Sequence, residues 1–362
     1  MRAGACSTRR WGISRTSATR RSSRSSRTAS HGPPGTSSIT TRIMEGGRML
    51  KVGFIGAGGR SRSAHYPNVH RLEGVSVEGV AELDQARGQE MVDKYGIPRL
   101  FENHEQLLDA VDLDAVYCVM NEVYVLEPAL ACISAGKHVF VEKPPGANTD
   151  ETQLLVDAAE ANGVHCMVGF QRRFSAVTVE AMRLVEENGP ATLVTGSFNK
   201  WLTGGPGNTS TLWNDVSHIV DLVRYMSGSE PTEVHAYRDS HGTDWRNCYT
   251  GMIRFDNHAT GIIMGNRASG GRVLRSELHG IGVGCYMDVP ESIEILEAGS
   301  APRVVTGAEL SGSAAGDSDR YEGVLSMHEH FVDCIRSGAT PTADIRDAIH
   351  SMRLVDRLEG TA

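Results

Sequence analysis

The sequence lacks the features that mark several common classes of protein. Its seven cysteines are odd in number, and no two of them form a C-x-x-C pair. Scattered cysteines of this kind indicate small buried side chains in a reducing cytoplasm. No apolar stretch reaches the ~18–20 residues that a membrane-spanning helix needs. The H-E-x-x-H motif of metalloproteases and the G-x-S-x-G motif of serine hydrolases are also missing. We therefore expect a cytoplasmic protein that needs neither a membrane nor a metal.

Charge is divided unevenly along the chain. The formal net charge is -8, yet residues 1–48 contain ten arginines, no lysine and one acid, Glu45. The remainder is therefore strongly acidic. An acidic globular body argues against nucleic acid and anionic membranes as partners.

The first 48 residues are predicted to be a disordered leader. They are rich in Arg, Ser and Thr and have almost no apolar periodicity, so they cannot bury enough surface to fold. Such a composition is also typical of a transit peptide, and a basic tail could bind nucleic acid. We expect instead that translation starts at Met44 or Met49, directly before the first strand.

Residues 49–172 alternate between strand and helix patterns. Strands are expected over Lys51–Ile55, Val75–Ala81, Leu113–Val119, His138–Val141 and His165–Gly169. Helices are expected over Asp84–Tyr95, Val125–Ser134 and Asp150–Asn162, the last with Thr149 or Asp150 as its N-cap. This alternation predicts an α/β Rossmann domain, a doubly wound parallel sheet with helices on both faces.

Residues 173–343 have a different pattern. After a helix over Val177–Asn188, strand-like runs follow, and those from Glu233 onward succeed one another through turns without helices between them. These runs are Ala191–Asn199, Glu233–Asp239, Tyr249–Phe255, Thr260–Asn266, Arg275–Ile281 and Ile293–Leu296. They predict a C-terminal α+β domain with an open, mainly antiparallel sheet covered on one face. We expect a flexible loop over Gly307–Asp319 and closing helices over Ser326–Ser337 and Asp344–Glu359, the latter within a C-terminal segment, residues 344–362.

A glycine-rich turn follows the first strand, in VGFIGAGGRS at residues 52–61. Gly56 allows the tight turn, and Gly58 lets the backbone approach a pyrophosphate. The amides that follow, at Gly59, Arg60 and Ser61, offer a partial positive charge to it. Ser61 occupies a position that usually holds Gly or Ala, which departs from the dinucleotide-binding pattern.

Glu82 ends the second strand, about twenty residues after the glycine turn. An acid there can bind both ribose hydroxyls and repel a 2′-phosphate, which favours NAD over NADP. Asp84 could take this role instead, and Glu82 could simply be a solvated acid. Arg60 acts in the opposite direction, because an arginine near the turn could accept a phosphate.

Four segments together resemble the Gfo/Idh/MocA family of NAD(P)-dependent sugar and polyol oxidoreductases. They are the glycine turn, Glu142-Lys143-Pro144, the run GFQRRF at 169–174, and Asp215-Val216-Ser217-His218. The resemblance extends over roughly residues 49–358. It implies hydride transfer between a secondary alcohol and NAD, and a homodimer or homotetramer formed through the outer face of the second sheet.

Lys143 is the strongest catalytic candidate. It follows the strand His138–Val141, at the end where open α/β sheets place their chemistry. Desolvation beside a nicotinamide cation would lower its pKa and let it exchange a proton with a substrate hydroxyl. We expect Glu142 to orient the cofactor or Lys143. The alternative for Lys143 is an ordinary surface lysine.

His218 lies on a predicted helix over Asn214–Met226. Periodicity alone places it on a polar face exposed to solvent. The resemblance instead implies that this face meets the nicotinamide and that His218 is catalytic. The acid four residues before the histidine, common in the family, is replaced by Asn214, so we expect Asp215 to hold substrate hydroxyls, with Asn214 as the alternative.

Four further residues complete the expected site. Many relatives carry Thr-Pro and then His after the fourth strand, but this chain has Met120 and Asn121, which we expect to contact the cofactor. Arg172, in the Gly-Phe-x-x-Arg pattern, could approach the nicotinamide or the substrate. Trp201, next to Lys200, would flank a sugar, with core packing as its alternative.

The sequence thus predicts interconversion of a secondary alcohol of a sugar, inositol or glycoside and its ketone. One alternative keeps this site but cleaves a glycosidic bond through transient oxidation, recycling the same NAD. An alternative of another class is a non-catalytic dinucleotide-binding regulator. Lys143 and His218 argue against a regulator, since it needs neither.

Overall fold

The computed structural model describes residues 48–202, 204–314 and 316–361. The predicted leader, apart from its last residue, lies outside the described residues. Within the described parts of the chain, no helix is both long and apolar enough to cross a membrane.

The first domain contains a six-stranded sheet in which every strand pair is parallel. Its strands are β1 (Leu50–Ile55), β2 (Val75–Ala81), β3 (Leu100–Phe101), β4 (Ala115–Cys118), β5 (His138–Val141) and β6 (Cys166–Val168). Its helical segments are η1 (Ser61–His65), α1 (Tyr66–Val69), α2 (Gln85–Tyr95), α3 (His104–Ala110), α4 (Leu126–Ser134) and α5 (Thr149–Asn162). The predicted Rossmann sheet is confirmed, although the sequence did not reveal β3 or α3.

The strand order reverses between β1 and β4. The order is β3-β2-β1-β4-β5-β6, so the chain moves outward from β1 to β3 and then returns to continue on the other side of β1. Open α/β sheets bind their ligands where the order reverses in this way, beyond the carboxyl ends of the strands. The glycine turn after β1 and the segments after β4 and β5 all meet there.

The second domain contains an eight-stranded sheet in the order β14-β13-β12-β11-β7-β10-β9-β8. The strands are β7 (Leu193–Trp201), β8 (Pro231–Asp239), β9 (Cys248–Phe255), β10 (Thr260–Ser269), β11 (Val273–Gly280), β12 (Val283–Asp288), β13 (Ser292–Glu297) and β14 (Arg303–Thr306). All pairs are antiparallel except β7 with β10. The predicted mainly antiparallel sheet is confirmed.

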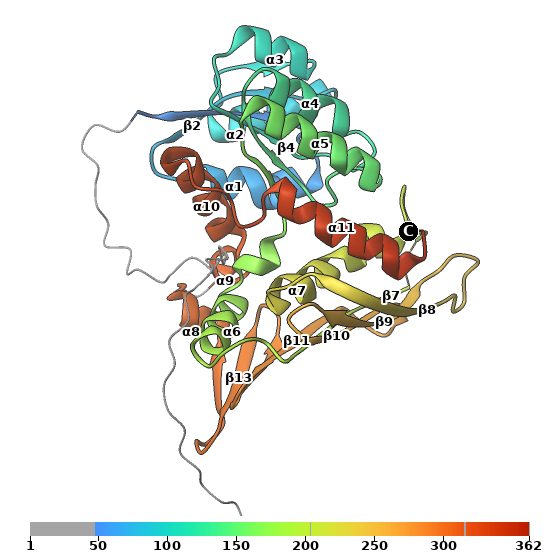
Figure 1. The fold of residues 1–362 in the computed structure, drawn as a ribbon. Helices are drawn as coiled ribbons and strands as arrows, with labels where there is room; N and C mark the ends of the chain where they lie inside the picture. The colour runs from blue at the N-terminus through green and yellow to red at the C-terminus, as the bar shows by residue number, and fades with distance from the viewer. Residues whose placement is uncertain (1–47, 203, 315, 362) are drawn as a thin grey trace, which may run out of the picture. The chain divides into compact units, whose positions relative to one another are not determined.

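One face of the second sheet is covered by helices (Figure 1). The helical segments of this half are η2 (Gln171–Phe174), α6 (Ala176–Glu187), η3 (Leu212–Val216), α7 (Ser217–Ser227), α8 (Gly307–Ser311), α9 (Ser318–Tyr321), α10 (Val324–Ser337) and α11 (Ile345–Glu359). Helix α7 packs on β7 and β10, and α6 packs on β11 and β12. Helix α11 contacts β8 as well as α5, and α10 contacts α1, so the C-terminal helices join the two domains. The predicted domain bounds stay a prediction.

Two local expectations were wrong. The segment Gly307–Asp319 is not a loop throughout, because a capping box between Thr306 and Glu309 starts α8. Two orphan backbone N–H groups are satisfied in this way, which stabilises even a short helix. The N-cap of α5 is Asn148, whose side chain accepts from the Glu151 amide, and neither Thr149 nor Asp150.

Candidate active site

The glycine turn combines one position that only glycine can fill with two positions of open backbone. Gly56 has φ +101°, and a Cβ built there would lie 2.4 Å from the Val119 carbonyl oxygen, so only glycine fits. A Cβ at Gly58 or Gly59 would meet nothing within 4 Å. Ser61 is fully buried and donates from Oγ to the same Val119 carbonyl at 3.2 Å. The unusual serine therefore ties the turn to the end of β4.

Glu82 lies at the end of β2 with both carboxylate oxygens engaged. The amide of Ala57 donates to Oε2 at 2.6 Å, and the Asp84 amide donates to Oε1 at 2.9 Å. Arg87 also donates to Oε1, at 2.7 Å. Burial alone would raise the pKa of Glu82, but the hydrogen bonds from Arg87 and the two amides outweigh it and lower the pKa. Glu82 is thus an ionised acid at the base of the glycine turn, with a partly exposed arginine beside it.

Glu142 ends β5 within a buried network. Its Oε1 accepts from Arg60 Nε at 3.0 Å and from His65 Nε2 at 2.8 Å, and its Oε2 accepts from the Lys143 amide at 2.9 Å. Burial raises the pKa of Glu142, but the His65 hydrogen bond and the nearby positive charges bring it well below the usual range. His65 Nδ1 in turn lies 3.2 Å from Nε2 of His328, which is fully buried on α10. This chain of contacts fixes the orientation of the residue that precedes Lys143.

Lys143 points from the end of β5 toward the second domain. Its Nζ donates to the Asn214 carbonyl oxygen at 2.5 Å. Burial, with the charges of Lys200 and Arg60, lowers the pKa of Lys143 to about 8, although the Glu142 charge acts in the opposite direction. A lysine with this pKa can carry or release a proton near neutral pH.

His218 lies on the polar face of α7 and is half-buried. Asp221, one turn further on, is buried and accepts from Arg173 Nε at 2.9 Å. Burial, with the charges of Lys143 and Arg172, lowers the pKa of His218 well below its ordinary value. Among the described residues, no group pairs with the buried His218 Nδ1. The periodicity-based expectation of a solvated face is wrong at Asp221, whose carboxylate is satisfied by Arg173 on η2 and Ser351 on α11.

Asp215 is held by two cations. Lys200 Nζ donates to its Oδ1 at 2.6 Å, and Arg267 pairs with its Oδ2. The preceding residue, Asn214, donates from Nδ2 to Glu122 Oε1 at 3.0 Å. Asp215 and Asn214 thus lie on one turn, η3, but the side chain of Asp215 binds cations, whereas that of Asn214 binds a carboxylate.

The remaining predicted residues are distributed around this centre. Arg172 is buried, and its nearest carboxylate oxygen, Glu322 Oε2, lies 3.8 Å from NH1. Asn121 is exposed and accepts from the Asn208 amide at 3.0 Å, while Met120 is half-buried against the core. Trp201 is 51% exposed at the end of β7.

Sequence reasoning missed several side chains that meet these residues. Glu122 is buried and accepts from Asn214 and from Thr209 Oγ1, the latter at 2.9 Å. Its position just beyond β4, at the same sheet edge as Glu142, was a signal that could have identified it. No local signal links His65 to His328, since they lie 263 residues apart.

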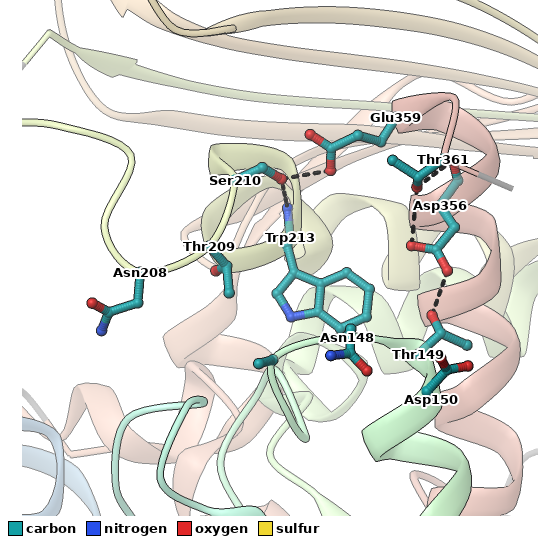
Figure 2. A pocket seen from close by; sticks show the side chains of 11 residues that line it. Asn148, Thr149, Asp150, Asn208, Thr209, Ser210, Trp213, Asp356, Glu359 and Thr361 are labelled. Carbon is teal, nitrogen blue, oxygen red and sulfur yellow. Dashed lines mark hydrogen bonds between the residues drawn. The ribbon is translucent and has the colours of Figure 1, made fainter.

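A separate cavity of about 470 Å³ lies between the start of α5 and the end of α11 (Figure 2). It is lined by Ala147, Asn148, Thr149, Asp150, Asn208, Thr209, Ser210, Trp213, Asp356, Glu359 and Thr361. None of the predicted catalytic residues lines it. Trp213 is anchored there by a hydrogen bond from Nε1 to the Gly146 carbonyl oxygen at 2.9 Å.

Comparison with protein families identifies the chain. Residues 50–170 match the model described as "Oxidoreductase family, NAD-binding Rossmann fold", GFO_IDH_MocA, and residues 181–281 match the "GFO/IDH/MocA C-terminal domain". The chain belongs to the Gfo/Idh/MocA family. The predicted family and its NAD-binding Rossmann domain are confirmed.

Two named relatives that match most of this Gfo/Idh/MocA chain are dehydrogenases. It is 28% identical to D-xylose 1-dehydrogenase (NADP(+)) 2 of Haloferax volcanii, over 86% of this chain and 97% of the relative. It is 25% identical to scyllo-inositol 2-dehydrogenase (NAD(+)) of Bacillus subtilis, over 80% of this chain and 87% of the relative. The uncharacterized oxidoreductase YrbE of Bacillus subtilis is 28% identical over 52% of this chain but only 57% of its own length. The predicted class, a dehydrogenase acting on the CH–OH group of a sugar or polyol, is confirmed.

The fold also matches solved structures. A levoglucosan dehydrogenase in complex with NADH and levoglucosan superimposes with a TM-score of 0.77 at 20% identity, over 86% of this chain and 97% of that chain. This likeness confirms the two-domain fold and carries no information on substrate.

Proposed function

We propose that the protein is an NAD-dependent dehydrogenase that interconverts a secondary alcohol of a sugar, inositol or glycoside and the corresponding ketone. The observation that carries this proposal is the position of Lys143. It combines a pKa lowered to about 8, a hydrogen bond to the η3 turn and a place directly beyond β5, at the edge of the sheet that carries the glycine turn.

The residues present fit a bound NAD. The open backbone at Gly58 and Gly59 leaves room for a pyrophosphate, and Glu82 stands where an acid reaches a ribose. The unpaired Nδ1 of His218 is a further buried group that requires a partner, counted over the described residues. When bound, NAD supplies the hydride acceptor, and the protein supplies placement and proton transfer.

Lys143 and His218 would remove the hydroxyl proton during oxidation. Both groups are largely neutral above pH 8, because burial lowers the pKa of each. The Asn214 carbonyl holds Lys143 Nζ in position, and Glu142 stabilises the ammonium form that results. Asp215, fixed by Lys200, would orient substrate hydroxyls.

We favour NAD over NADP because Glu82 is ionised and would repel a 2′-phosphate. Arg87 weakens this preference, since its guanidinium pairs with Glu82 and is itself partly exposed. The two named relatives above differ in this respect, one using NADP(+) and the other NAD(+).

A homo-oligomer in the cytoplasm is part of the proposal. The outer face of the second sheet carries exposed apolar side chains, including Tyr237 and Met252. The six cysteines of the described chain are free, and five of them are buried, which suits a reducing compartment.

A panel of sugars, inositols and glycosides tests the function. Purified protein with NAD should produce NADH absorbance with at least one free sugar or polyol and leave glycosidic bonds intact. Cleavage of a glycoside without net NADH would support the transient-oxidation alternative. NAD binding without turnover on any member would support a regulator.

A further inference from the structure

Cationic side chains gather around one aromatic ring beside His218. Phe198, on β7, has its ring centroid 6.1 Å from that of His218. Lys200 Nζ lies 4.9 Å and the Arg272 guanidinium carbon 5.6 Å from the same centroid. Two cations therefore lie next to the catalytic histidine, on the second domain's side of the site.

The carboxylates in this region do not balance these charges. Lys200 shares Asp215 with Arg267, so one acid serves two cations. Arg272 is exposed, and within the described chain it forms no ion pair or hydrogen bond. The charges that act most strongly on His218 are those of Lys143, Arg172, Arg60 and Lys200, all positive. On the second domain's side of His218 the cations thus outnumber the carboxylates, whereas Glu142 and Glu122 lie on the first domain's side.

Arg172 adds an unsatisfied guanidinium. Its Nε and NH1 are buried, and neither has a hydrogen-bond partner among the residues that the structure describes. Glu322 is too distant, at 3.8 Å, for a normal hydrogen bond. Arg272 lies close enough for its charge to help lower the pKa of Arg172, after burial. A buried N–H without an acceptor is unfavourable, and a ligand with paired oxygens would relieve this cost.

We propose that the substrate is an anionic sugar, whose carboxylate or phosphate binds Arg172, Lys200 and Arg272. This inference rests on the proposed function and narrows its substrate class. The planar guanidinium matches the paired oxygens of both groups, and Lys200 adds a point charge. The substrate alcohol then lies between this anion site and Lys143.

Matched substrates test the charge requirement. With NAD, kcat/KM for glucuronate or glucose 6-phosphate should exceed that for glucose by roughly tenfold or more, mainly through a lower KM. The methyl ester of glucuronate should behave like glucose. The carboxylate and phosphate arms identify which anion the site prefers.

Variants locate the anion site. Arg272→Gln is the main variant, because an exposed side chain can be changed without loss of folding. It should raise KM for the anionic sugar and leave KM for glucose nearly unchanged. Arg172→Gln and Lys200→Gln should raise KM for the anionic sugar by a larger factor than KM for glucose, which also depends on Asp215, held by Lys200. Arg275→Gln, an exposed arginine three positions along on β11, is the matched control and should leave both values unchanged.

Calorimetric binding in the presence of NAD separates this inference from the proposed function. Equal or tighter binding of glucose than of both anionic sugars overturns the inference, whether or not turnover occurs. If the protein oxidises neutral sugars and no anionic sugar, the anion-site inference is overturned, but the proposed dehydrogenase function stands. Tighter anion binding that disappears in Arg272→Gln supports the inference even without turnover, which would contradict only the proposed function. If Arg172→Gln weakens NAD binding and leaves anion binding unchanged, Arg172 contacts the cofactor and is not part of the anion site.

Discussion

Burial lowers the pKa of the Lys143 ammonium to about 8, and this value sets an expected pH dependence. Oxidation needs the neutral amine as a base. Its kcat/KM should therefore rise with pH below about 8 and level off above it. Ketone reduction needs the ammonium and should decline above the same pH. Initial rates of NADH formation and consumption, measured between pH 6 and about 10, would show both pH profiles, because the lysine titrates within this range.

Variants of Lys143 and a surface lysine complete this test. Lys143→Ala should lower turnover by roughly 10²–10⁴-fold, as expected on loss of a general acid–base group. The exposed Lys94→Gln should keep both the rate and the pH profile. His218→Ala with near-normal turnover would leave Lys143 as the sole proton carrier.

Glu82 and Arg87 should set the cofactor preference in opposite directions. Glu82→Ala should narrow the preference for NAD over NADP, because it removes ribose contacts and the repulsion of a 2′-phosphate. Arg87→Ala should widen that preference, because it removes the cation that pairs with Glu82. Dissociation constants for both dinucleotides, from fluorescence titration, measure the effect.

The exposed acid Glu90, on the same helix, provides the control. Glu90→Ala should leave the ratio of the two dissociation constants unchanged. A wild-type protein that binds NADP more tightly would show that Arg87 and Arg60 together outweigh Glu82.

Among the elements, α7 shows most clearly what the sequence could and could not predict. The face opposite His218 is apolar and packs into the core, where Ile219 and Val220 are fully buried. Its polar face was predicted to be solvated, yet Asp221 is 1% exposed. Periodicity records which face is polar, but it cannot tell whether water or a distant ion pair satisfies that face. The partner here, Arg173, is 48 residues away in the chain.

The buried pair Arg173–Asp221 should contribute strongly to the stability of this region. Asp221 accepts from Arg173 and from Ser351 Oγ, the latter at 2.7 Å, and so links α7 to η2 and α11. Asp221→Ala should lower the free energy of unfolding by about 3–5 kcal/mol, because it leaves a buried guanidinium only partly compensated by Asp347. Urea unfolding followed by circular dichroism measures this loss.

An exposed ion pair gives the comparison for that value. Glu90→Ala breaks the pair with Arg62, in which both side chains are largely exposed, and should cost less than about 1 kcal/mol. A similar loss of unfolding free energy for both variants would mean that Asp221 stabilises the protein no more than a surface acid does.

For the whole molecule, the order of the two domains was predictable, but the way they are joined was not. The change from alternating helices and strands to consecutive strands marks the domains in the sequence. No sequence pattern predicts that α10 and α11 return to pack against the first domain. This packing depends on contacts such as His65 with His328, and Val168 N–H with the Ala343 carbonyl at 2.8 Å. Residues near the C-terminus therefore help to build the sheet edge that carries Lys143.

The outer face of the second sheet should form the subunit interface. One cross-strand row on this face runs through His235, Met252, Ile262 and Thr195 on adjacent strands. Tyr237 and Met252 are 77% and 55% exposed, which is unusual for large apolar side chains on a monomer. A symmetric dimer would bury this face against itself. Light scattering coupled to size-exclusion chromatography should give the mass of a dimer or tetramer, and Met252→Asp should reduce it.

Leu154 provides the control for this last prediction. It is 49% exposed on α5, in the other domain, so Leu154→Asp should leave the mass unchanged. Because Met252 is exposed in the single chain, its replacement should not disturb folding, and circular dichroism should stay the same. A wild-type protein of monomeric mass, or a Met252→Asp variant that keeps the wild-type mass, would contradict an interface on this face. The exposed apolar row would then need another partner to cover it.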